Sequence, residues 1–174
     1  MIIRNSKFNC YKLFFLLMLV VMCFFSCHKG VKADSIAPDF VLSDINDYPV
    51  SLKSYRGYVV LLDFWATWCY ACRMSIPELI KLQNKYKNKG LRIVSISLDS
   101  PYYVSNTDLL KFKKALGINY KILRGNIKVI KDYFGDQKPL IPTMFVIDKD
   151  GRIKAKIIGF NPMALRKILT KLMK

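Results

Sequence analysis

The sequence predicts an α/β domain in which helices cover a β-sheet. Residues 58–65 are almost all apolar, as is typical of a strand that is buried on both faces. Apolar residues recur at helical spacing in some of the following segments and alternate with polar residues in others. The length of 174 residues suffices for one domain with a hydrophobic core, so we expect a single domain over residues 38–174.

The first 26 residues are interpreted as a lipoprotein-type signal peptide and not as part of the fold. Basic residues precede the apolar run 13–25, which is shorter than the roughly 20 residues of a membrane-spanning helix. The residues before Cys27 resemble a bacterial lipobox, which predicts lipidation of Cys27 and a tether over residues 27–37. The alternative is an uncleaved anchor. Either arrangement holds the domain in the cell envelope, on the outer side of the cytoplasmic membrane.

The chain is strongly basic, with 29 Lys and Arg against 12 Asp and Glu and a formal net charge of +17. The simplest interpretation is a lysine-rich surface in contact with solvent. Attraction to anionic lipid headgroups or to an acidic partner is the alternative. Nucleic acid is not expected as a partner, because the chain carries an export signal and no nucleic-acid-binding motif.

Two cysteines, Cys69 and Cys72, directly follow the buried strand and open the next helix. This spacing lets the thiols form a disulfide within one helical turn. The helix N-terminus stabilises a thiolate, and the cationic Arg73 acts in the same direction, so Cys69 is the predicted nucleophile and Cys72 the resolving thiol. The other three cysteines lie in the first 27 residues, so no structural disulfide is expected beside this pair.

The chain has too few cysteine and histidine ligands for a metal site at the cysteine pair. A structural zinc ion needs four ligands, yet no cysteine or histidine follows Cys72, and the sole histidine is His28. A cysteine hydrolase would need a histidine base, and a copper-delivery module would need a distant histidine ligand. We therefore expect no metal and no cofactor, since the electrons of a dithiol reside on sulfur.

Asp63 is a carboxylate inside the apolar strand. Burial raises the pKa of such a group and is costly unless the group is paired or functional. We predict that Asp63 exchanges protons with the Cys72 thiol during disulfide exchange. The alternative is a strand-end acid bonded to a neighbouring backbone.

Turn signals and hydrophobic periodicity divide the remainder of the chain into helices and strands. A small hairpin is expected from residues 40–42 and 50–52. The predicted helices cover residues 72–88, a segment containing Leu109, Phe112 and Leu116, residues 127–134, and a last helix that Asn161 caps. The further predicted strands are 91–98, 120–123, 143–147 and 152–158, with a turn at Asp150 and Gly151.

Residues 60–72, VLLDFWATWCYAC, resemble the active-site strand and turn of the thioredoxin superfamily. Pro77 falls where thioredoxins kink the active-site helix, and residues 141–143, IPT, resemble their cis-proline loop. Residues 37–40, APDF, and 142–152, PTMFVIDKDGR, are similar to the membrane-tethered TlpA/ResA-like reductases. This resemblance implies a thioredoxin fold with a central mixed sheet, an N-terminal β-hairpin extension and a central αβ insertion at about residues 100–125.

The same resemblance implies the roles of several residues. Pro142 would form a cis bond with Ile141 and line the substrate loop, and Trp68 would support the cysteine pair. In some members the insertion supplies an acid near the cysteines, for which Asp99 is the candidate here. The Tyr70-Ala71 dipeptide lacks the proline common before the second cysteine, and the redox potential and direction of electron flow do not follow from it.

The expected function is that of an extracytoplasmic thiol:disulfide oxidoreductase. By resemblance, a membrane thiol carrier would donate electrons, and apocytochrome c or another exported disulfide-containing protein would accept them. A thiol peroxidase of the same fold is an alternative, but its signature would need proline at 62 and threonine at 66, where this chain has Leu62 and Ala66. A tethered, non-enzymatic binding or metal-delivery module is a further alternative.

Overall fold

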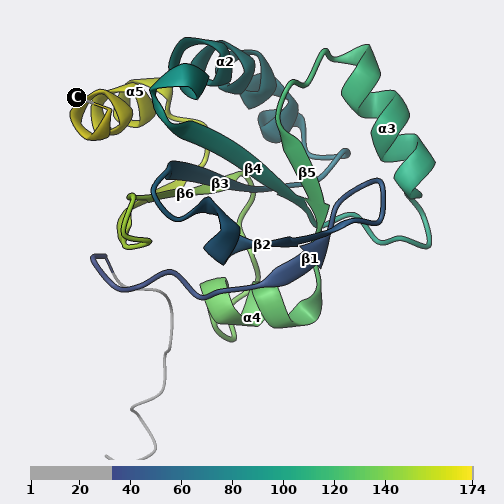
Figure 1. Ribbon diagram of the computed structural model, residues 1–174. Coiled ribbons are helices and arrows are strands. Elements are labelled where there is room, and N and C mark those ends of the chain that lie inside the picture. Colours follow the sequence, from purple (N-terminus) through teal and green to yellow (C-terminus); the bar gives the residue numbers. More distant parts are fainter. Residues whose placement is uncertain (1–32, 174) are drawn as a thin grey trace, which may run out of the picture.

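The computed structural model describes residues 33–173, so the predicted signal, Cys27 and most of the tether lie outside the described residues. Figure 1 shows one sheet with helices on both sides and a small hairpin beside it. The strands are β1 Val41–Ser43, β2 Pro49–Ser51, β3 Val59–Trp65, β4 Leu91–Ser97, β5 Lys121–Arg124, β6 Thr143–Ile147 and β7 Ile153–Ile158. The helices are α2 Tyr70–Tyr86, α3 Asn106–Ala115, α4 Ile127–Phe134 and α5 Pro162–Leu172, with short 3-10 turns η1 Leu52–Tyr55 and η2 Lys87–Lys89.

The predicted mixed sheet is confirmed, with strand order β5-β4-β3-β6-β7. Strands β3, β4 and β5 run parallel, while β6 is antiparallel to both β3 and β7. All seven residues of β3 are buried, because this strand has a neighbour on each side and a helical layer on each face. The carboxyl end of β3 therefore leads from the middle of the sheet directly into α2.

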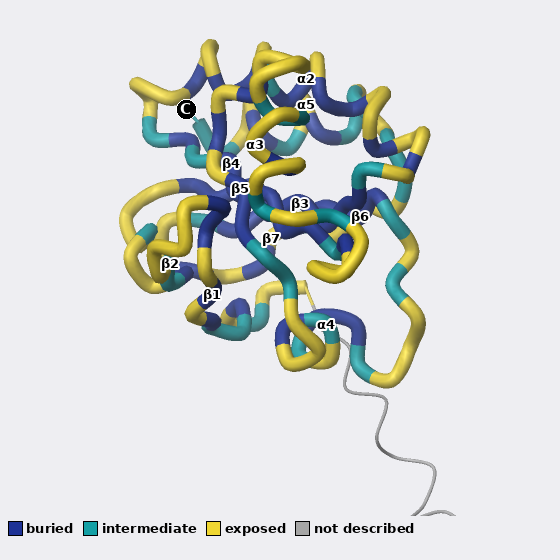
Figure 2. The backbone as a smooth tube through the Cα atoms, turned by 90° about the vertical axis from the view of Figure 1, so that its right-hand side faces the viewer, coloured by how far each residue is buried: buried dark blue, intermediate teal, exposed yellow. Residues whose placement is uncertain are grey.

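Two hydrophobic cores lie on the two faces of the sheet. Leu61 and Trp65 of β3 pack with residues of α2, α3 and α5. Val60 and Leu62, which alternate with them, pack with residues of α4 and the β1–β2 hairpin. Figure 2 shows the buried strands as a dark layer between helices whose outer turns are exposed. This alternation follows from the two-residue side-chain period of a strand.

Several element boundaries differ from those predicted from the sequence. Helix α2 begins at Tyr70 and not at Cys72, because the sulfur of Cys69 accepts the backbone N–H of Cys72 and caps the helix. Tyr58 lies before β3 and is 37% exposed. Leu116 is 42% exposed at the C-cap of α3, so the apolar stripe of this helix is carried by Leu109 and the half-buried Phe112.

The predicted insertion consists of a loop, α3 and β5. Ser105 and Asp108 form a reciprocal capping box that fixes the first turn of α3. The Phe112 ring lies 5.3 Å from the Trp65 ring, between ring centroids, and Leu109 is fully buried. These contacts attach the insertion to the last residue of β3, close to the point where the chain turns into the cysteine pair.

Two further contacts hold the layers in place. The Arg166 guanidinium of α5 donates to both carboxylate oxygens of Glu78 in α2, with its Nε 2.6 Å from Oε1. At the β6–β7 turn, Gly151 has a φ of 80° and donates its N–H to the carbonyl oxygen of Asp148. A residue with a side chain is strained at this φ, so the turn requires glycine. In residues 33–173, no helix is both long enough and apolar enough to cross a membrane.

Candidate active site

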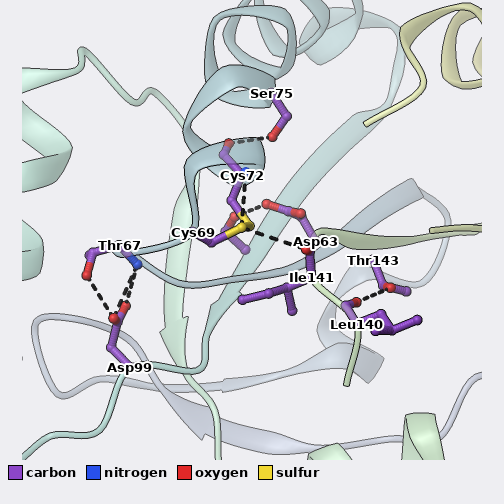
Figure 3. Close-up of a disulfide and its surroundings, with 10 residues drawn as sticks. Asp63, Thr67, Cys69, Cys72, Ser75, Asp99, Leu140, Ile141 and Thr143 are labelled. Atoms are coloured by element: carbon purple, nitrogen blue, oxygen red, sulfur yellow. Dashed lines mark hydrogen bonds between the residues drawn. A yellow bond between two sulfur atoms is a disulfide. The ribbon is translucent and has the colours of Figure 1, made fainter. Parts of the chain in front are cut away.

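A disulfide joins Cys69 and Cys72 at the N-terminus of α2, with a Cα–Cα distance of 5.2 Å. Cys69 is the N-cap residue in extended conformation, and its sulfur lies 3.2 Å from the backbone nitrogen of Cys72 (Figure 3). Cys69 is 7% exposed and Cys72 is 1% exposed. The sulfur of Cys69 is therefore the more accessible of the two, and it lies where the helix offers unpaired N–H groups.

Two aromatic side chains flank the disulfide on the surface. Trp68 is 71% exposed and Tyr70 is 70% exposed, although both are large apolar groups next to a buried cysteine. The Arg73 guanidinium lies over the Tyr70 ring at 5.9 Å from its centroid. Arg73 therefore contacts the Tyr70 ring, and its exposed guanidinium group lies at the first turn of α2.

Asp63 points from β3 toward the layer of α2. It lies between Leu61 and Trp65 on the same face of the strand, and these two residues belong to the same core cluster as Cys69 and Cys72. Burial raises the pKa of the Asp63 carboxyl group to about 7, although the hydroxyl of Ser95 donates to Oδ2 at 2.9 Å and lowers it. Its other oxygen, Oδ1, is buried without a hydrogen-bond partner. The group can therefore take up or release a proton near neutral pH.

The carboxylate of Asp99 holds the loop between β3 and the cysteine pair. It accepts the backbone N–H of Thr67, with Oδ2 at 3.0 Å, and the Thr67 hydroxyl, with Oδ1 at 2.8 Å. The hydroxyl of Ser97 donates to Oδ2 at 2.9 Å. Asp99 thus joins the end of β4 to a residue two positions before Cys69, and its hydrogen bonds go to the loop and not to the sulfurs (Figure 3).

The loop before β6 approaches the disulfide from the other side. The peptide bond between Ile141 and Pro142 is cis, and the carbonyl oxygen of Ile141 lies 3.7 Å from the sulfur of Cys69. The hydroxyl of Thr143 donates to the carbonyl oxygen of Leu140, which closes this turn. The structure therefore places Ile141 beside the cysteine pair, although Ile141 and Cys69 are 72 residues apart in the chain.

Two polar partners in the site were not predicted from the sequence. Ser95 lies directly opposite Asp63 in the β3–β4 register, and Thr67 bonds to Asp99. The available signal was a serine between two apolar residues of the predicted strand 91–98, where a buried hydroxyl needs a partner. In the described part of the chain, His, Cys, Asp and Glu form no group of three or more placed to hold a metal ion.

Comparison with known proteins assigns the chain to a family. Residues 33–156 match the model of the AhpC/TSA family. The chain belongs to the AhpC/TSA family. The thiol-disulfide oxidoreductase ResA of Bacillus cereus is 34% identical to this chain over 162 residues, which cover 84% of this chain and 87% of ResA. ResA of Geobacillus thermodenitrificans is 35% identical over 136 residues, covering 78% of this chain and 75% of that protein.

Solved structures of thiol:disulfide exchange proteins are also similar to this AhpC/TSA member. A DsbE-type thiol:disulfide interchange protein from Chlorobium tepidum has a TM-score of 0.72 and 30% identity, covering 83% of this chain and 100% of that chain. The thioredoxin domain of a Bacteroides vulgatus thiol-disulfide oxidoreductase has a TM-score of 0.69 and 25% identity, covering 82% and 99%. The protein is thus a TlpA/ResA-like thiol:disulfide oxidoreductase of the thioredoxin superfamily. The predicted resemblance, fold and enzyme class are confirmed.

Proposed function

We propose that this protein reduces disulfides of exported proteins, with Cys69 as the attacking thiol and Cys72 as the resolving thiol. The observation that carries this proposal is the position of the disulfide at the start of α2, where Cys69 is the more exposed of the two cysteines, at 7% against 1% for Cys72. The reduced Cys69 would have the backbone N–H of Cys72 directed at its sulfur, as well as the positive end of the helix dipole. Both interactions favour the thiolate, which is the form that attacks disulfides.

The reaction proceeds in two exchanges. The Cys69 thiolate attacks one sulfur of the substrate disulfide, which forms a mixed disulfide and releases the other substrate sulfur as a thiolate. Cys72, once deprotonated, attacks the sulfur of Cys69 and displaces the second substrate thiolate. The substrate gains two electrons, and the protein is left with the Cys69–Cys72 disulfide.

Asp63 is the proposed acceptor of the Cys72 proton. Its Oδ1 has no hydrogen-bond partner, and its pKa of about 7 lets it accept and release a proton near neutral pH. The hydroxyl of Ser95 holds Oδ2 and leaves Oδ1 available. The alternative of a strand-end acid bonded to backbone does not fit this position, because Asp63 lies within β3 and its hydrogen-bond partner is a side-chain hydroxyl.

The Ile141–Pro142 loop is proposed to bind an extended segment of the substrate beside the dithiol. The carbonyl oxygen of Ile141 lies next to the sulfur of Cys69, so a substrate backbone N–H paired with this loop would bring its cysteine to the same place. Trp68 and Tyr70, the chain neighbours of Cys69, add exposed apolar area. This arrangement suits partly unfolded substrates, which expose apolar residues near their disulfides.

The cell-envelope location and the electron path rest on the sequence. The signal-like residues 1–26 and the lipobox-like Cys27 support a lipid anchor on the extracytoplasmic side of the membrane. A membrane thiol carrier would then rereduce the Cys69–Cys72 disulfide, and apocytochrome c is one substrate that such a reductase could serve. A peroxidase function is disfavoured, since the fully buried Leu62 and Ala66 occupy the positions where its signature needs proline and threonine.

Cysteine substitutions test the proposal. Cys69→Ser should abolish reduction of insulin in the presence of dithiothreitol, because the remaining thiol, Cys72, is only 1% exposed. Cys72→Ser should instead trap a mixed disulfide through Cys69, visible as an adduct on a non-reducing gel. Insulin reduction at the wild-type rate by Cys69→Ser would show that the assignment of the nucleophile is wrong.

A further inference from the structure

An open pocket of about 370 Å³ lies at the amino ends of β4 and β5, and four cationic side chains line it. They are Lys87, Arg92, Lys113 and Lys121. None of the residues that line this pocket, all of them in the described part, is acidic. We call these four residues the cationic pocket. Converging positive charges in a concave site favour a ligand with several negative oxygens.

Two of these cations are held in place by the fold. The Arg92 guanidinium lies 4.0 Å from the centroid of the Tyr58 ring, and it donates to the carbonyl oxygens of Lys87 and Leu91. The amino group of Lys113 donates to the carbonyl oxygen of Tyr120 at 2.8 Å. Since these side chains are already ordered, a ligand would lose less conformational entropy on binding.

The positive charge of the pocket is incompletely balanced. The carboxylate of Asp44 pairs with Lys121 at 2.9 Å and accepts backbone N–H groups of Asn46 and Tyr48. Burial, followed by the neighbouring charge of Lys121, lowers the pKa of Lys113, while Asp44 raises it by a smaller amount. The lysines therefore repel each other, and an anion in the pocket would relieve this repulsion.

The pocket and the dithiol lie at opposite ends of the sheet. Arg92 and Lys121 open parallel strands, whereas Cys69 follows the carboxyl end of the parallel strand β3. The backbone N–H of Ala37 donates to the carbonyl oxygen of Gly151 in the β6–β7 turn. Because β6 is antiparallel to β3, this turn also lies at the pocket end of the sheet. The tether of the proposed function therefore joins the domain at the pocket end.

The segments next to the disulfide differ in charge from the pocket. Residues 66–72 and 139–142 contain no charged side chain, although the exposed Arg73 follows directly. The loops at the pocket end add Arg56 and Lys89, both exposed, and also the exposed acidic Asp150 of the β6–β7 turn. The pocket, with four cations and no acidic side chain among its described lining residues, is therefore the feature that an evenly solvated lysine coat, the simplest interpretation of the sequence, does not explain.

We propose that the cationic pocket binds the phosphate of an anionic phospholipid headgroup, so that the tethered domain docks reversibly on the membrane by its pocket end. The undocked domain remains free to turn its dithiol toward the membrane thiol carrier. The phosphate oxygens would accept from Lys87, Arg92 and Lys113, while Lys121 remains paired with Asp44. This inference goes beyond the proposed reductase function and rests on it only for the membrane tether, which keeps the pocket close to the lipid surface.

The test uses residues 33–174, because they contain both cores and because the solved Chlorobium relative corresponds to 83% of this chain and is a folded protein on its own. This fragment should sediment with vesicles of phosphatidylglycerol and phosphatidylcholine at low salt, and not with phosphatidylcholine alone. Lys87→Gln/Lys113→Gln should weaken binding roughly 25-fold, since each cation near an anionic surface contributes about fivefold. The matched control Lys111→Gln/Lys167→Gln removes the same charge from exposed helix positions, and should weaken binding less than about fivefold.

Three results would overturn the inference. These are no binding to anionic vesicles, equal losses for the two variants, or binding of inorganic phosphate in the pocket without retention by vesicles. The single variant Lys87→Gln changes one exposed residue and provides the test if the double variant does not fold. Insulin reduction should be unchanged in the pocket variants, and Cys69→Ser should still bind vesicles, so failure of the reductase proposal and failure of this one are distinguishable.

Discussion

Replacing Asp63 by asparagine should stabilise the oxidised protein at neutral pH. The carboxyl group is buried in β3, and burial raises its pKa from 3.8 to about 7. Between these two pH values the folded protein keeps a proton that the unfolded chain has lost, so the free energy of unfolding falls as pH rises. The loss begins near pH 3.8 and is complete above about pH 7. It amounts to about 4 kcal/mol, at about 1.4 kcal/mol per tenfold change in the dissociation constant.

Asp63→Asn removes this pH dependence, because an amide does not titrate. Denaturant unfolding of the oxidised proteins should show nearly equal stabilities for wild type and variant at pH 4, and a more stable variant at pH 8, by up to about 4 kcal/mol. Equal stability of the two proteins at pH 8 would refute the argument, since it would mean that Asp63 ionises in the folded protein at no cost.

Asp44→Asn provides a matched control with the opposite sign. This carboxylate is also buried, but hydrogen bonds from Lys121, Asn46 and Tyr48 outweigh the effect of burial and lower its pKa. Its contribution to stability is present above the pKa of the unfolded chain and is lost as pH falls. Asp44→Asn should therefore destabilise the protein at pH 8, where Asp63→Asn stabilises it.

The stabilised Asp63→Asn variant should be the poorer enzyme. If Asp63 accepts the Cys72 proton, its loss should slow release of the mixed disulfide on the order of 100-fold at neutral pH. Single-turnover measurements with a fluorescent disulfide would show the mixed disulfide accumulating through Cys69. A wild-type release rate in this variant would mean that the proton of Cys72 leaves by another route.

Two further predictions concern the loops. Asp99→Ala leaves the N–H and hydroxyl of Thr67 without their acceptor and should lower the free energy of unfolding by about 2–3 kcal/mol. Thr67→Val removes only the hydroxyl and should cost about 1 kcal/mol. Equal losses for the two variants in denaturant unfolding would contradict the role of the carboxylate. Gly151→Ala should cost about 1 kcal/mol, because this residue has a φ of 80°. An unchanged midpoint in a thermal melt would show that the turn accommodates a side chain.

The order of helices and strands follows largely from local sequence. The apolar run 58–65 predicted the central strand, and the structure places all of β3 in the core. Helix α4 and strand β6 have the predicted bounds. Asn126 caps α4, and β6 begins at Thr143, directly after a proline. Helix α2 was predicted two residues late, since the capping contact is made by a sulfur and not by one of the usual oxygen side chains.

The pairing of residues distant in the chain depends on how the strands pack into one sheet. Local sequence was enough to predict that two thiols share one helical turn and that an acid lies in the buried strand before them. The β3–β4 register placed Ser95 opposite Asp63, and sheet order placed the carbonyl of Ile141 beside Cys69. Those contacts join segments 32 and 72 residues apart. These contacts cannot be predicted from the periodicity of a single segment, because they form only when separate strands pack their apolar faces against the same helices.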